Sequence, residues 1–165
     1  MELFFERPVK TFQLREISRL TKIAVTSVKN YVKELVKENL ILKTKTSIYL
    51  GYVANESGKM FKVYKRQTMI LKLHKSGFVE YIERVARPSA IVLFGSAGKG
   101  EYTEKSDIDI FVQSSEYEFK LEKFEKILKH RINILFESNL DSLSKELLNN
   151  LANGVVLSGY LRVKK

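Results

Sequence analysis

The chain has 165 residues, a formal net charge of +10 and no cysteine, which excludes disulfides, thiolate metal sites and cysteine nucleophiles. No apolar run approaches the roughly 20 residues that a membrane-spanning helix needs. The N-terminal stretch MELFFERPVK has acidic residues within its only apolar patch, which is typical of neither a signal peptide nor an anchor. We therefore expect a soluble, cytoplasmic protein that does not contact the membrane.

The positive charge is concentrated in the first half of the chain. Residues 1–86 contain 17 Lys and Arg against 8 Asp and Glu, whereas residues 87–165 contain 12 against 11. A basic half beside a nearly neutral half predicts that the first half binds a polyanion. The alternative is a lysine-rich surface that only keeps the protein in solution.

The segment 13–40 predicts two helices separated by a short turn at TKIA, because apolar residues recur in it at helical spacing. Tyr31 lies beside the apolar stripe of the second helix, and we predict that it is a core residue. The next stretch is rich in β-branched and aromatic residues and predicts one or two tightly joined strands. The apolar stripe of the second helix consists of Val28, Val32, Leu35 and Val36.

This order of two helices, a turn and a small basic ribbon resembles a winged helix-turn-helix domain over roughly residues 10–55. One departure is Lys22, which stands where such turns often carry glycine. The family places its second helix in the major groove of DNA and its wing against phosphates. A small helical domain used for dimerisation, with a merely solvated lysine face, is the alternative. The resemblance assigns the DNA contacts to Thr26, Ser27, Lys29, Asn30, Lys33, Lys43 and Lys45.

Residues 61–86 predict two helices that are separated at Gly77, a suitable helix C-cap. His74 in this segment, and His130 further along, are single histidines among lysines, and we predict that both are surface residues. We interpret the segment as a helical connector whose apolar side packs on one or both domains.

A domain boundary is predicted at Pro88, because proline cannot continue a helix and favours extended geometry in the residue before it. The aliphatic run AIVLF that follows predicts a short, buried, parallel strand. The predicted organisation is an N-terminal domain over 1–60, a connector over 61–87 and a second domain over 88–165.

Residues 93–112, LFGSAGKGEYTEKSDIDIFV, combine a glycine-bearing loop with two aspartates inside an aliphatic run. The glycine spacing fits neither the dinucleotide-binding fingerprint nor the Walker A loop. Alternation along a strand sends Asp107 and Asp109 to the same face. Two carboxylates so placed repel each other unless a divalent cation lies between them, and their oxygens suit Mg²⁺ or Mn²⁺. Glycine and serine at the preceding strand end allow a phosphate to approach the backbone, so the pattern favours in-line displacement at phosphorus.

The pattern Gly-Ser, ten residues, Asp-x-Asp resembles the signature of the polymerase-beta-like nucleotidyltransferase superfamily, in its minimal nucleotidyltransferase branch. The resemblance covers about residues 88–160 and includes NGVVLSG near the C-terminus. It implies an α/β (α+β) domain with a small mixed sheet that takes a nucleoside triphosphate as substrate. It also implies that Asp107 and Asp109 are catalytic and hold Mg²⁺ or Mn²⁺. The nucleotide-binding residues that it implies are Gly95, Ser96, Lys99, Gly100 and Ser106, with a merely solvated loop lysine as the alternative for Lys99.

One position departs from that family. The next strand usually supplies a third carboxylate, but the matching position in RINILF is Asn133. Asparagine can ligate a metal weakly through its carbonyl oxygen and brings no charge. Glu137 shares the strand face but lies about 13 Å further along, too far to substitute. We therefore predict binding of nucleotide and metal, and leave catalysis open.

Two functions remain. The first is the transfer of a nucleoside monophosphate, AMP from ATP, to a protein or small-molecule hydroxyl, by an enzyme that also binds DNA through its winged helix. The second is a DNA-binding transcriptional regulator whose nucleotidyltransferase domain is degenerate and senses a nucleotide. Family members that partner HEPN-type toxins act as antitoxins, so the resemblance also implies a HEPN-type partner. A homodimer is common in this architecture.

Overall fold

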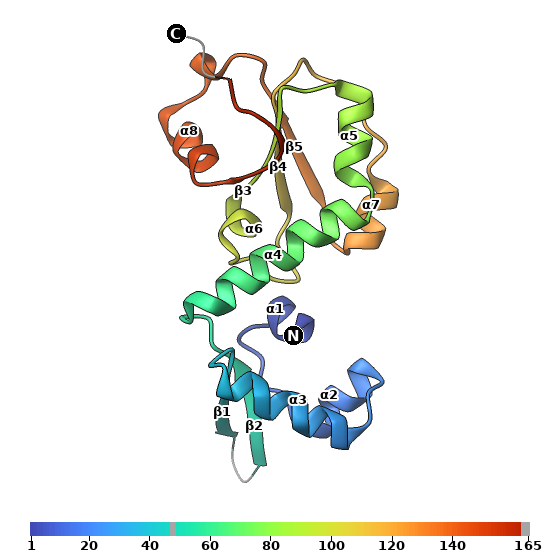
Figure 1. Ribbon diagram of the computed structural model, residues 1–165, viewed down its shortest axis with the longest axis vertical. Coiled ribbons are helices and arrows are strands. Elements are labelled where there is room, and N and C mark those ends of the chain that lie inside the picture. Colours follow the sequence, from blue (N-terminus) through green and yellow to red (C-terminus); the bar gives the residue numbers. More distant parts are fainter. Residues whose placement is uncertain (47–48, 163–165) are drawn as a thin grey trace. The chain divides into compact units, whose positions relative to one another are not determined.

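A computed structural model of the protein describes residues 1–46 and 49–162. It divides the chain into two compact units, residues 1–63 and 64–165. The described residues form eight α-helices, one short 3₁₀ helix and six strands, a mixed α/β composition (Figure 1). Within these described ranges, no helix has both the length and the apolar character that crossing a bilayer requires.

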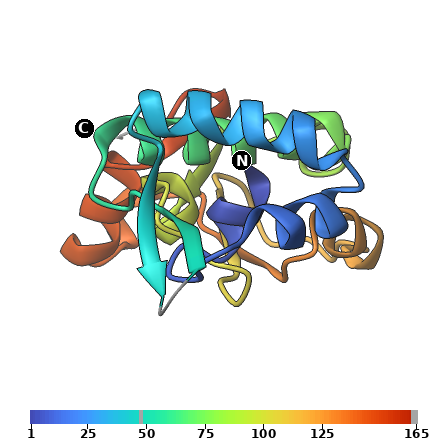
Figure 2. The same cartoon turned by 90° about the horizontal axis from the view of Figure 1, so that it is seen from below.

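The first unit consists of three helices followed by a two-stranded antiparallel hairpin. Phe12 adds one further bridge to Tyr52 on the hairpin, and both side chains are buried in the core of this unit. Figure 2 shows the hairpin at the end of α3 that lies opposite the α2–α3 turn. The elements are α1 (Glu2–Glu6), α2 (Leu14–Thr21), α3 (Val25–Lys37), β1 (Ile41–Thr46) and β2 (Tyr49–Ala54).

The turn between α2 and α3 has the backbone geometry that glycine favours. Lys22, at the C-cap of α2, has a φ of 57°, in the left-handed region. The Ser18 hydroxyl closes the turn by donating to the carbonyl oxygen of Ile23 at 2.6 Å. The position at which the sequence lacks the expected glycine is therefore a left-handed one, and a lysine occupies it.

Helix α3 buries two residues of the predicted apolar stripe, leaves Leu35 and Val36 half-buried, and leaves Tyr31 outside the stripe. Val28 and Val32 are buried, whereas Tyr31 is 60% exposed. The prediction that Tyr31 is a core residue was wrong. Successive residues of a helix point about 100° apart, so the residue before Val32 lies on the flank of the stripe, where its ring reaches solvent.

The second unit is built on a four-stranded mixed sheet in the order β5-β4-β3-β6. Strand β3 pairs antiparallel with both of its neighbours, and only β4 and β5 are parallel. The small mixed sheet is as predicted, but the parallel direction predicted for AIVLF was wrong. This central strand is aliphatic because helices cover both of its faces, and burial on two faces does not fix the direction of the neighbours. The strands are β3 (Ala90–Phe94), β4 (Ile108–Val112), β5 (Ile132–Phe136) and β6 (Val155–Gly159).

Helices cover the two faces of this sheet, with α8 on one face and α5 and α7 on the other (Figure 1). Ile91 and Leu93 of β3 belong to the core that includes residues of α4, α5 and α7, whereas Val92 packs with Leu140 and Leu151 on the opposite face. The alternation along β4 is the same, with Ile110 in the first core and Phe111 in the second. The helices are α4 (Lys59–Lys75), α5 (Phe78–Ala86), α6 (Gly95–Lys99), α7 (Glu122–Leu128) and α8 (Lys145–Ala152), and η1 spans Leu140–Ser142.

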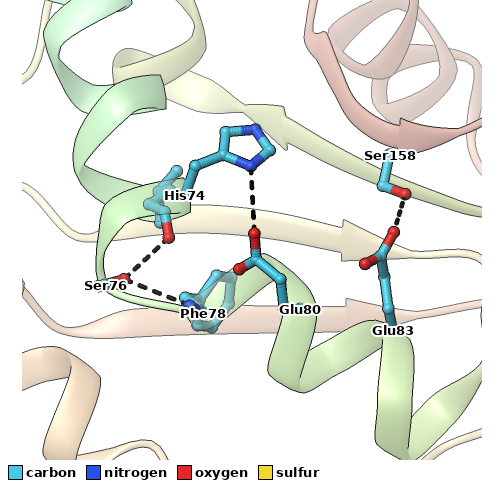
Figure 3. Close-up of polar contacts among 7 residues, drawn as sticks. His74, Ser76, Phe78, Glu80, Glu83 and Ser158 are labelled. Atoms are coloured by element: carbon cyan, nitrogen blue, oxygen red, sulfur yellow. Dashed lines mark hydrogen bonds and ion pairs between the residues drawn. The ribbon is translucent and has the colours of Figure 1, made fainter.

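The segment predicted as a helical connector contains two helices, and Gly77 separates them with a φ of 75°. This confirms the predicted cap, and α5 ends two residues before Pro88. Figure 3 shows the polar contacts around this corner: the Ser76 hydroxyl accepts from the Phe78 N–H, His74 faces Glu80 at 3.9 Å, and Ser158 donates to Glu83. The apolar side of these helices lies in the core of the second unit through Met69, Leu73, Phe78, Val79, Ile82 and Ala86.

Candidate active site

The two aspartates of the Asp-x-Asp motif converge on one point. Asp107 directly precedes β4 and Asp109 lies within it, and neither side chain is fully buried. The amide nitrogen Nδ2 of Asn133 donates to Asp107 Oδ2 and to Asp109 Oδ1, at 3.3 Å in each case. The carboxylates therefore approach the same atom from one face of the strand, as the alternation predicted.

Asn133 reaches this point because β4 and β5 are parallel and in register. The Cα of Asp109 is paired with that of Asn133, which is the position assigned to the third acidic residue from the sequence. Its two N–H groups offset part of the repulsion between the acids, because each carboxylate accepts a hydrogen bond from them. Unlike an acidic residue, this side chain cannot accept a proton from an attacking hydroxyl.

Gly95 brings the glycine-serine turn against the acidic pair. Phe94 at the end of β3 is paired with Asp109, so the next residue begins α6 beside that carboxylate. The φ of Gly95 is 65°, and a Cβ at this position would lie 2.2 Å from Asp109 Oδ2. Only glycine fits here, for reasons of both backbone conformation and space. Ser96, the next residue, is half-buried in the first turn of α6.

The other predicted nucleotide-binding residues lie along the loop that follows α6. Lys99 is exposed at the end of that helix, and Gly100 caps it with a φ of 73°. Ser106 is engaged within the loop, because its hydroxyl accepts from the Thr103 N–H at 2.9 Å. This hydrogen bond within the loop fixes Ser106, the residue before Asp107. The contribution of Ser106 to nucleotide binding remains a prediction.

A buried stack of side chains holds this loop in place. The ring of Tyr102 packs edge-on against the ring of His130, with centroids 5.7 Å apart, and faces Lys65 Nζ at 4.8 Å. His130 is only 6% exposed, so the prediction that it is a surface residue was wrong. Its Nδ1 lies 2.8 Å from the carbonyl oxygen of Ser106, and this contact joins the segment before β5 to the residue before Asp107.

Glu137 does not supply the missing charge. Its Oε1 accepts from the Asn139 N–H at 2.9 Å, within the turn that follows β5. Hydrogen bonds from that N–H and from Ser142 lower the pKa of the Glu137 carboxyl, which therefore stays ionised as part of the turn.

A cleft of about 380 Å³ opens beside the acidic pair, and Asp107 is one of its lining residues. Three cationic residues line it as well: Lys105, Lys129 and Arg131. They were not predicted from the sequence, because Lys105 is an unspecified residue of the ten-residue spacer, Lys129 and Arg131 lie in another part of the chain, and no local pattern joins the two parts. The parallel pairing of β5 with β4 brings Arg131 next to Asp107, and its carbonyl oxygen accepts from the Ile108 N–H at 2.8 Å.

The donor set of the acidic pair suits a divalent cation that also binds phosphate. No group of three or more acidic or histidine side chains occurs among residues 1–46 and 49–162 that could hold a metal by itself. Mg²⁺, however, is usually held by one or two carboxylates together with substrate phosphates. The convergence of Asp107 and Asp109 beside the turn at Gly95 fits that arrangement. Asn133 turns its amide nitrogen towards the pair, so its carbonyl oxygen would act as a third donor only after the amide group rotates.

The residues predicted to contact DNA lie in the first unit on α3 and β1. All of them except Ser27, which is half-buried, are exposed. The side chains of Thr26, Asn30 and Lys33 share the face of α3 opposite the buried Val28 and Val32. Lys43 and Lys45 follow on β1, and both are accessible to a ligand.

Comparison with known proteins finds a family similarity within the second unit. The model of a family described as the nucleotidyltransferase domain matches residues 76–152. The matched segment contains the glycine-serine turn, both aspartates and Asn133. The match supports the nucleotidyltransferase superfamily for this part of the chain, and such domains generally use a nucleoside triphosphate and a divalent metal ion. No curated protein matches the chain at a significant level.

Proposed function

We propose that the second unit transfers a nucleoside monophosphate, AMP from ATP, to a hydroxyl of a protein or a small molecule. The observation that carries this proposal is the convergence of Asp107 and Asp109 on one point, directly beside the turn at Gly95 and Ser96. The family match over the same segment supports nucleotidyl transfer as the chemistry.

In the proposed reaction, the triphosphate lies against the N–H groups and the Ser96 hydroxyl at the start of α6. The oxygen of the acceptor hydroxyl forms a bond to the α-phosphorus, and the bond from that phosphorus to the oxygen bridging to the β-phosphate breaks. Pyrophosphate leaves, and the hydroxyl proton passes to solvent, because Asn133 cannot accept it. Asp107 and Asp109 would hold a divalent ion, which would supply positive charge for the phosphate oxygens and would lower the pKa of the attacking hydroxyl.

The first unit is proposed to be a winged helix that binds DNA through α3 and the β1–β2 hairpin. Its order of elements, its exposed lysines and the left-handed turn at Lys22 support this interpretation. The exposed Tyr31 adds an aromatic ring on the flank of the same helix. An interaction with a HEPN-type protein, and assembly as a homodimer, are proposed from the resemblance alone.

The second candidate is a DNA-binding regulator that binds the nucleotide without transferring it. Asn133 is the observation that favours it, because an uncharged third position weakens activation of the attacking hydroxyl more than it weakens binding of the triphosphate.

The test is to incubate the protein with ATP labelled at the α-phosphate, Mg²⁺ and cognate lysate. Label transfer in the wild type that is lost in both Asp107→Ala and Asp109→Ala is the result expected of the enzyme. Binding of ATP without transfer would establish the sensor instead. Absence of both binding and transfer would overturn both candidates.

A further inference from the structure

The cleft beside the acidic pair is lined by acidic and cationic residues. The acidic side chains have interaction partners within the protein, and the cationic ones form no ion pairs with any residue that the structure describes. Among its acidic residues, Glu125 accepts from the Ile132 N–H at 2.9 Å, and Asp107 accepts from Asn133. The third acid, Glu104, also has a partner within the protein. The acidic side chains of the cleft are therefore engaged by the fold.

The cationic residues of the cleft are not engaged in the same way. In the part of the chain that the structure describes, no acidic side chain forms an ion pair with Lys105, Lys129 or Arg131, and all three are exposed. Three unpaired cations around one cleft favour a ligand that carries negative charge. Phosphate is the group that best suits arginine, because its oxygens accept two parallel hydrogen bonds from a guanidinium.

The topology of the sheet separates this cleft from the turn that is proposed to bind the triphosphate. Strand β4 lies between β3 and β5. Gly95 and Ser96 follow β3 on one side of β4, whereas Lys129 and Arg131 precede β5 on the other side. Asp107 lies between them and lines the cleft. A ligand in the cleft thus reaches Asp107 from the side of β4 opposite the glycine-serine turn.

We propose that this cleft binds the acceptor substrate, and that the acceptor carries a phosphate group in addition to the hydroxyl that is modified. This inference rests on the proposed function, and it adds the site and the chemical class of the acceptor. Lys105, Lys129 and Arg131 bind the phosphate, which places the hydroxyl beside Asp107. The hydroxyl oxygen then bonds to the α-phosphorus, pyrophosphate leaves from the opposite side, and the proton passes to solvent.

The test is an NMR titration of the amide groups with glycerol 3-phosphate, using glycerol at the same concentrations as the matched ligand without phosphate. We expect glycerol 3-phosphate, but not glycerol, to shift the amides of Lys105, Lys129 and Arg131. Arg131→Gln and Lys105→Gln should each weaken this binding by about five- to tenfold, the loss expected for one charge-assisted hydrogen bond in an open site. Lys126→Gln, an exposed lysine of α7 outside the cleft, should leave it unchanged.

A parallel titration with a non-hydrolysable ATP analogue and Mg²⁺ reports on the glycine-serine turn separately. Equal shifts with glycerol and glycerol 3-phosphate, or equal weakening in Lys126→Gln and Arg131→Gln, would overturn the acceptor site and leave the proposed function intact. A nucleotide analogue that does not shift the amides of Gly95 and Ser96 would overturn the proposed function, and the acceptor role of the cleft with it.

Discussion

Asn133 occupies the position at which a nucleotidyltransferase of this pattern is expected to carry a third acid. In the structure its amide group donates to both aspartates, and these hydrogen bonds offset part of the repulsion between the two carboxylates. Because an uncharged residue already stabilises the two nearby carboxylates, the folded protein depends less on a metal ion to offset their repulsion. The substitution Asn133→Asp therefore tests whether these hydrogen bonds stabilise the acidic pair.

We expect Asn133→Asp to make the stability of the protein depend on a divalent ion. The change removes two hydrogen bonds and adds a like charge, which should lower the free energy of unfolding by about 1 kcal/mol or more in EDTA. Mg²⁺ should restore it, because an ion that binds only the folded state stabilises that state. Thermal melts with EDTA and with Mg²⁺ measure this difference, and label transfer shows whether the added charge also raises activity.

Asn133→Ala is the matched control, because it removes the same hydrogen bonds without adding charge. Its melting temperature should respond to Mg²⁺ less than that of Asn133→Asp. An equal response of the two variants would mean that the third position does not face the metal site.

Gly95→Ala tests the close approach of the turn to Asp109. The φ of 65° disfavours alanine by about 1–2 kcal/mol, and the new Cβ would also displace the Asp109 carboxylate. Gly77→Ala is the control, since its φ is 75° but no atom lies within 4 Å of the added Cβ. We expect similar losses of stability in urea for the two variants, but a loss of about 100-fold in transfer rate only for Gly95→Ala. Equal transfer rates would show that Asp109 tolerates the displacement.

At the scale of single elements, the α2–α3 turn stores unfavourable backbone energy at Lys22. Its left-handed φ favours glycine, so Lys22→Gly should stabilise the first unit by about 0.5–1 kcal/mol. The same substitution at Lys29, inside α3, should destabilise it by about 1 kcal/mol, because glycine is a poor helix former. Urea unfolding followed by circular dichroism checks both signs, and a destabilising Lys22→Gly would contradict the turn geometry.

The elements also differ in how well the sequence predicted them. The helices over 14–21 and 25–37 and the cap at Gly77 followed from apolar spacing and turn chemistry, which are local properties. The direction of β3 relative to its neighbours could not be predicted in this way, because it depends on which strands pair with β3. The burial of His130 was predicted wrongly for a related reason, because it depends on neighbours that the fold supplies, such as the tyrosine ring that packs against it. The error at Tyr31 is local, because the angular spacing of helix residues already places it on the flank of the apolar stripe.

At the scale of the whole molecule, the asymmetry of charge predicts how the proposed binding of DNA depends on salt. Four of the residues assigned to the DNA face are lysines: Lys29, Lys33, Lys43 and Lys45. If all four contact phosphates, the logarithm of the affinity should fall with the logarithm of the salt concentration with a slope of about −3 to −4. Lys33→Ala should reduce that slope by about 0.9. Fluorescence anisotropy with duplex DNA measures it.

Lys126→Ala, in the second unit, is the control for this experiment and should leave the slope unchanged. Binding that does not depend on salt would contradict an interface with phosphates and would favour dimerisation as the role of the first unit.

The sequence by itself predicted the acidic pair and the glycine-serine turn, because fixed spacing and strand alternation are properties of the chain alone, and the family resemblance added the position of Asn133. Only the tertiary structure decided that both carboxylates share one amide donor, that Gly95 abuts Asp109, and that a cationic cleft opens beside Asp107. These features depend on the parallel pairing of β4 with β5 and on the antiparallel pairing of β4 with β3. Strand pairing joins residues far apart in the chain, and no local pattern encodes it.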